Sequence, residues 1–124
     1  MKLSMVGKSE PLTLETSEGE VNLMVTELTY NDITRHNELI KHMYDEKNQI
    51  KDSAKLIDLT AARVMCAIKN LDGTYYFNQV SVEEYLEHVA DAPGDFTLQL
   101  NDVVTRVNPY QLPEDTLESK KKPS

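Results

Sequence analysis

A run of apolar residues near the middle of the chain restricts the fold more than any other feature. From Leu59 to Leu71 the helical pattern is apolar on nearly every side, instead of along a single stripe. A helix of this kind needs cover all round, so we expect it to be the most buried helix of the domain. The pattern begins after Asp52-Ser53, and we expect the Asp72-Gly73 pair to end it in a turn.

Alternating residues near the N-terminus predict a β-hairpin. Within residues 11–25, every second position on either side of a Gly-containing loop belongs to one face, which carries Leu12, Leu14 and Thr16 before the loop and Val21, Leu23 and Val25 after it. A period of two on both sides of such a loop is typical of two antiparallel strands with one buried face.

Three other segments carry apolar residues at helical spacing, and each follows a residue that can cap a helix. The expected helices cover residues 30–50, residues 82–91 and a last segment that ends at Pro109. Their candidate caps are Thr29 with Asp32, Ser81 with Glu84, and Asp95. The run Tyr75-Tyr76-Phe77 is β-prone and predicts a short strand or edge segment.

These segments together predict an α+β fold, in which an N-terminal β-hairpin packs on a bundle of about four α-helices. The chain has 124 residues, which suits a single domain. We place that domain at residues 1–109. Residues 110–124 are polar and include Lys120-Lys121-Lys122, so we expect them to form a disordered tail.

The chain carries an excess of negative charge. It has 13 Lys and Arg residues against 21 Asp and Glu residues, for a formal net charge of −8. Such a charge repels phosphate, so binding to nucleic acid or to an anionic membrane is disfavoured. No stretch approaches the roughly 20 apolar residues of a membrane span. With one cysteine there is no support for a secreted, disulfide-stapled fold, and we expect a cytoplasmic protein.

No sequence pattern predicts catalysis, a cofactor or a metal site. Cys66 lies inside the most apolar helix, where a cysteine behaves as a small hydrophobe and not as a nucleophile. His42 and Glu46 supply two potential metal ligands, but zinc requires three or four. The four glycines are too scattered for a phosphate-binding loop. We therefore expect a protein that is not an enzyme.

Tyrosine and methionine residues suggest a surface for a protein partner, because both residue types are favoured at interfaces. The alternative is that these side chains fill the core of a small domain that lacks tryptophan. We predict a groove between the 30–50 helix and the last helix, formed by Met43, Tyr44, Val103 and Val107. Tyr76 is a further predicted partner-binding residue.

The order of these elements is similar to that of a known family of phage proteins. After the hairpin, the relevant segments read VTELTYNDITRHNELIKHM, LTAARVMCAIKNLDGTYYF, SVEEYLEHV and LQLNDVVTRVNP. They resemble the tail assembly chaperones of lambda-like siphophages. In that family a helix ends in an Asp-x-Gly or Asp-Gly turn, and a short extended run, two small helices and a loose tail follow. The resemblance covers residues 11–109.

The resemblance implies a non-enzymatic assembly factor in the host cytoplasm, which is not expected in the mature virion. Members of the family bind the tape measure protein, keep this long helical protein soluble and help to recruit the tail tube protein. Many self-associate, so the resemblance also implies a homo-oligomer. A translational frameshift extends the C-terminus in such chaperones, and the lysine run at residues 120–122 is compatible with a slippery A-rich stretch.

Two other functions stay open at the level of the sequence. One is an acidic mimic of DNA, or another small phage or prophage regulatory protein, that blocks a partner protein. A DNA mimic needs a dense stripe of negative charge, but here Lys and Arg are interleaved with the acids throughout residues 35–70. A small enzyme with an unfamiliar site would need titratable groups that converge in a pocket.

Overall fold

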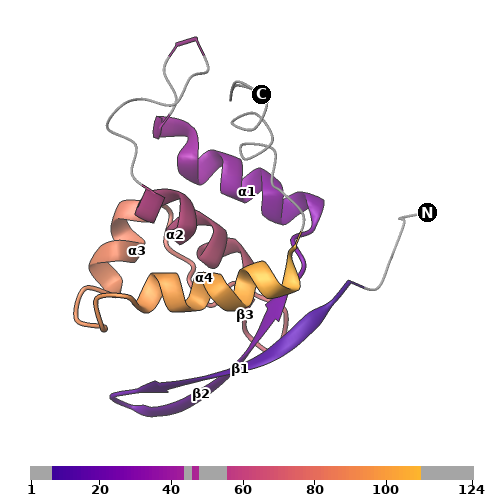
Figure 1. Ribbon diagram of the computed structural model, residues 1–124, viewed down its shortest axis with the longest axis vertical. Coiled ribbons are helices and arrows are strands. Elements are labelled where there is room, and N and C mark those ends of the chain that lie inside the picture. The colour runs from indigo at the N-terminus through magenta and orange to yellow at the C-terminus, as the bar shows by residue number, and fades with distance from the viewer. Residues whose placement is uncertain (1–6, 44–45, 48–55, 110–124) are drawn as a thin grey trace.

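The computed structural model describes residues 7–43, 46–47 and 56–109, shown in Figure 1. In chain order the elements are β1 (Ser9–Thr16), β2 (Gly19–Thr26), α1 (Tyr30–Ile40), the 3-10 helix η1 (Lys41–Met43), α2 (Leu56–Ala67), β3 (Ile68–Lys69), α3 (Val82–His88) and α4 (Phe96–Val107). The strands form an antiparallel sheet in the order β1-β2-β3. The predicted α+β fold is confirmed, because the described residues contain an N-terminal hairpin and four α-helices. The predicted tail at 110–124 lies outside the described residues.

The helix α2 lies at the centre of the core, as its pattern predicts. Six of its residues have no exposed surface: Ala61, Ala62, Val64, Met65, Cys66 and Ala67. In Figure 1 α2 lies between α1 and α4, and it packs against both of them and against α3. The second half of α2, which is apolar on nearly every side, is therefore the most enclosed part of the helix.

The central helix ends earlier than predicted. It stops at Ala67, and the next two residues form β3, which pairs with β2. A continuous apolar run does not distinguish a buried helix from a buried strand, so the pattern alone placed this boundary wrongly. Leu71, predicted to be helical, is 65 % exposed and lies in the turn with Asp72-Gly73.

The predicted hairpin is confirmed, and its turn consists of Ser17 and Glu18. Gly19 follows with a φ of 115°, a left-handed conformation that glycine adopts without a steric penalty. On the predicted inner face, Leu23 and Val25 are buried in the core, whereas the apolar residues nearer the tip are only half buried. The end of the hairpin therefore extends past the helices, as Figure 1 shows.

The start of α1 is as predicted, but its end is not. The Thr29 hydroxyl accepts a hydrogen bond from the Asp32 backbone, and the Asp32 carboxylate accepts one from the Thr29 backbone at 2.9 Å, which completes a capping box. The α-helix then ends at Ile40 and one 3-10 turn follows to Met43, so the predicted helix over 30–50 is too long. Residues 46–47 lie in a turn.

The C-terminal end of α4 is hydrogen-bonded to the segment that precedes α1. Asp95 precedes α4 as predicted, but its carboxylate accepts a hydrogen bond from Gln99 at 2.7 Å instead of capping the helix. After the helix, the Asn108 side-chain oxygen accepts a hydrogen bond from the Leu28 backbone at 2.8 Å. The C-terminal end of α4 therefore lies beside the segment that leads into α1.

A buried ion pair fixes α1 to the sheet. Lys69 Nζ on β3 lies 3.0 Å from Asp32 Oδ2, and both side chains are almost fully buried. The Tyr75 hydroxyl donates a hydrogen bond to the other Asp32 oxygen at 2.6 Å. Of the predicted extended run at 75–77, Tyr75 alone is paired, in an isolated bridge with Lys69. The sequence suggested Asp32 only as a helix cap, so this second role was missed.

Arg35 on α1 ties the same region to the end of α2. Its guanidinium donates hydrogen bonds to the backbone carbonyls of Met65, of Phe77 at 2.7 Å and of Gln79 at 3.1 Å. It also lies 4.1 Å from the centre of the Tyr75 ring, within range of a cation–π contact. These bonds hold the segment that leads into α3.

The outer edge of the sheet carries a proline where a hydrogen-bond donor would otherwise face outward. The Glu27 N–H donates to the Lys8 carbonyl at 3.0 Å, and such pairs alternate along an antiparallel ladder. Counting from that pair, the position of Pro11, opposite Met24, has its nitrogen directed away from β2. Proline has no N–H, so the edge of β1 is a poor template for another strand.

Replacement of Pro11 by valine restores an N–H at this edge. We expect Pro11→Val to aggregate faster than the wild type in concentrated solution, as measured by light scattering. Thr13→Val is the matched control, because it places the same side chain at an edge position that already has its N–H. Equal rates for all three proteins would contradict a blocking role for the proline.

Removal of the Lys69 ammonium leaves the Asp32 carboxylate buried without its cation. We expect Lys69→Met to lower the free energy of unfolding by about 3 kcal/mol, measured by urea denaturation. The double variant Asp32→Asn with Lys69→Met should lose less than the sum of the two single variants, because no buried charge remains. A loss below about 0.5 kcal/mol for Lys69→Met, the usual effect of a surface substitution, would show that the pair does not hold α1 in place.

Candidate partner-binding groove

The short helix α3 is capped at its start and bonded to α4 from its middle. The Ser81 hydroxyl caps it by accepting a hydrogen bond from the Glu84 backbone at 3.1 Å. The Glu84 carboxylate accepts from the Val80 backbone at 3.4 Å, so the predicted capping box is only half formed. On the inner side, the Tyr85 hydroxyl lies 3.0 Å from the Thr97 hydroxyl at the start of α4. The helix ends at His88, short of the predicted residue 91.

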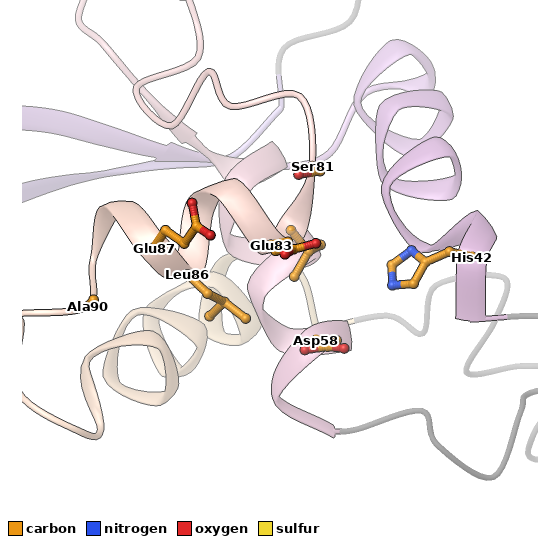
Figure 2. Close-up of a pocket in the computed structure, with 8 residues that line it drawn as sticks. His42, Asp58, Ser81, Glu83, Leu86, Glu87 and Ala90 are labelled. Carbon is orange, nitrogen blue, oxygen red and sulfur yellow. The ribbon is translucent and has the colours of Figure 1, made fainter.

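A pocket opens between α3, the start of α2 and the 3-10 turn that follows α1. Its volume is about 700 Å³. Figure 2 shows the side chains around it: His42 reaches toward it from η1, Asp58 lies in the first turn of α2, and the other lining residues belong to α3 or flank it. These others are Ser81, Val82, Glu83, Leu86, Glu87 and Ala90. We call this pocket the α3 groove.

The floor of the α3 groove is apolar. Val82, Leu86 and Ala90 are spaced by four residues, so they follow one another along one face of α3 and of the turn after it. Val82 is buried, Leu86 is half buried and Ala90 is exposed, so the row becomes more open to solvent toward its C-terminal end. Rows of side chains at this spacing form the ridges that pack into the grooves of a neighbouring helix.

The rim of the α3 groove is acidic. Glu83 and Glu87 form a second row beside the apolar one, and Asp58 stands on the wall that α2 provides. Within the described part of the chain, none of these three carboxylates takes part in a hydrogen bond or an ion pair through its side chain. Among the described residues, the groove therefore combines an apolar floor with carboxylates that have no cationic partner, an arrangement suited to contact with another protein rather than with phosphate.

The residues predicted to bind a partner do not form a single surface. Met43 and Val107 belong to the core and are 2 % and 4 % exposed, whereas Tyr76 and Val103 are half buried. Tyr44 lies outside the described residues. Met43 follows the end of α1, but Val107 lies near Leu28 at the other end of that helix, so the structure does not bring these two residues together.

The sequence contained part of the signal for the α3 groove. The apolar spacing of Val82 and Leu86 was visible, and so were the glutamates beside them. What could not be read was that Asp58 and His42, which are distant along the chain, lie on the facing wall. That placement depends on how η1 and α2 pack, which single-sequence periodicity does not report.

The structure also places the cysteine and the histidines that the sequence offered as candidates for chemistry. Cys66 has no exposed surface, and burial raises the pKa of its thiol to about 12. Of the three histidines, His36 is buried and His42 and His88 are exposed. The described residues contain no cluster of three potential metal ligands. The helices of these same residues include no candidate for a membrane span.

The buried thiol should be unreactive in the native protein. With a pKa of about 12, roughly one Cys66 in ten thousand is a thiolate at about pH 8, and only the thiolate attacks a disulfide reagent. We expect labelling by a coloured aromatic disulfide to be slow in buffer and to become fast in urea, where the pKa returns to about 8.5. Rapid labelling without urea would show that α2 is not enclosed.

Comparison with known proteins shows a likeness among solved structures. No protein-family model matches the sequence, and no curated protein matches it at a significant level. The chain is similar to the bacteriophage HK97 tail assembly chaperone, whose solved structure aligns over 80 % of this chain and 85 % of that chain. The two share 19 % sequence identity, with a TM-score of 0.41.

Proposed function

We propose that this chain is a phage tail assembly chaperone, which acts by binding another protein and not by catalysis. Its main partner in this proposal is the tape measure protein, which it keeps soluble, and it helps to recruit the tail tube protein before leaving the finished tail. It would act in the host cytoplasm. The observation that carries the proposal is the α3 groove, with its apolar floor and acidic rim. The order of elements described from the sequence supports it.

The groove suits a helix presented by a long partner. The row of Val82, Leu86 and Ala90 offers a ridge against which a partner helix can pack, as in other helix-in-groove complexes. Full burial of a leucine side chain contributes about 1.5–3 kcal/mol, so one such contact is weak on its own. Many copies along one long protein add up through linked binding, which makes weak individual contacts sufficient.

The charge of the chain serves the same purpose. A carrier of an aggregation-prone protein has to keep the complex soluble, and a net charge well away from zero does so. The formal charge of −8 therefore fits a carrier of this kind. Self-association and a longer form made by frameshifting belong to the proposal as well, on the ground of the sequence resemblance.

The residues selected from the sequence enter the proposal in different ways. Tyr76 and Val103 are partly exposed and can contact a partner directly. Met43 is buried and follows His42 in η1, so its role in the proposal is to anchor the 3-10 turn that carries His42. Val107 is buried at the C-terminal end of α4, so its role in the proposal is limited to the packing of that helix. Tyr44, outside the described residues, stays a predicted contact.

The proposal is tested by co-expression with the tape measure protein of the same phage. Wild-type chain should move the tape measure protein from the pellet to the soluble fraction. Leu86→Asp should abolish this effect, because it puts a charge on the apolar floor of the groove. Measurement is by quantitative gel analysis of the two fractions.

A matched control separates loss of binding from loss of folding. Leu98 on α4 is 45 % exposed and does not line the groove, so Leu98→Asp makes the same change elsewhere and should retain the effect. Thermal unfolding followed by circular dichroism checks that both variants fold. A wild-type chain that fails to solubilise the tape measure protein would refute the proposed function, and full activity of Leu86→Asp would refute the choice of groove.

A further inference from the structure

The acidic rim of the α3 groove has no balancing cation in the described part of the chain. Glu83 and Glu87 are exposed on one side of the apolar row, and Asp58 stands on the opposite wall. Among the described residues that line the groove, His42 alone can carry a positive charge. An occupant with negative flanks would meet like charge on both sides, which disfavours it.

We infer that the segment recognised by the α3 groove is a basic amphipathic helix of the partner protein, with an apolar stripe flanked by Lys or Arg residues. The inference rests on the proposed function and specifies the chemistry of the partner at that site. The apolar stripe contacts Val82, Leu86 and Ala90, while the basic residues lie over the rim carboxylates. The charge complementarity of floor and rim is what selects this occupant.

The spacing of the rim sets the spacing of the basic residues. Glu83 and Glu87 are four residues apart, which is about 6 Å along a helix axis. A partner helix that lies along α3 matches them with Lys or Arg at positions i and i+4 on one flank. The lined stretch runs from Ser81 to Ala90, so about two to three turns of partner helix are engaged.

Exposed charge pairs add little affinity but favour one sign of charge. Each pair at a solvent-exposed rim contributes modestly, and two or three together change the affinity by about tenfold. Salt screens such pairs, so the preference should shrink at about 1 M salt, whereas the apolar contact should persist. Selectivity between basic and acidic helices is therefore the quantity to measure.

Two synthetic helical peptides of roughly 15 residues serve as probes for the full chain. They share one leucine stripe, but its flanks carry lysines in one peptide and glutamates in the other. Fluorescence anisotropy should show the lysine peptide binding about tenfold more tightly at low salt. Glu83→Gln with Glu87→Gln should weaken this preference, and Glu83→Lys with Glu87→Lys should reverse it.

The hairpin provides a matched control. Glu15 and Glu20 face each other across β1 and β2 near the tip, are exposed, and do not line the groove. Glu15→Lys with Glu20→Lys makes the same change in net charge and should leave the peptide preference intact. If it lowers the preference as much as the rim variant does, the attraction comes from overall charge, and the inference is overturned.

Other outcomes identify a different occupant. Equal binding of the two peptides, or binding that survives Leu86→Asp, would overturn the inference. Tighter binding of a peptide with the sequence of residues 112–124, compared with the lysine peptide, would assign the groove to this chain's own lysine segment. If the charge-reversed rim variant still solubilises the tape measure protein and the peptides bind equally, the inference fails while the proposed function stands.

Discussion

Because α2 is apolar on nearly every side from Leu59 onward, most of its surface has to be kept from water, and each of the other α-helices packs against it. α1 and α4 pack on two sides, α3 packs on a third, and β3 continues the chain directly into the sheet. The buried pair of Lys69 and Asp32, with the Tyr75 hydroxyl, ties α1 to β3. Arg35 ties the same helix to the end of α2.

Much of this fold follows from local patterns, and the differences have physical causes. The alternation from Leu12 to Val25 was enough to predict the hairpin, and the cap at Thr29 was enough to predict the start of α1. The end of α2 could not be read, because Ile68 is apolar in a helix and in a buried strand alike. The role of Lys69 was also hidden, since a charged residue is normally exposed and only its tertiary partner explains its burial.

The candidate site was less accessible to sequence reasoning than the fold. The selected residues were large and apolar, and the structure uses Met43 and Val107 for packing in the core. The α3 groove instead combines a modest apolar row with charged neighbours, and its second wall comes from Asp58 and His42. Individually these residues resemble any solvated helix surface. They become a candidate site only because the cover around α2 leaves a depression at this end of α3.

The central claim is that a partner helix occupies the α3 groove. Hydrogen–deuterium exchange of the full chain, alone and in the soluble complex obtained by co-expression with the tape measure protein, tests it most directly, because bound segments exchange more slowly. The account predicts slower exchange over residues 82–90 and in the first turn of α2, with little change along β1. Slower exchange confined to β1 or α4, with α3 unchanged, would contradict it.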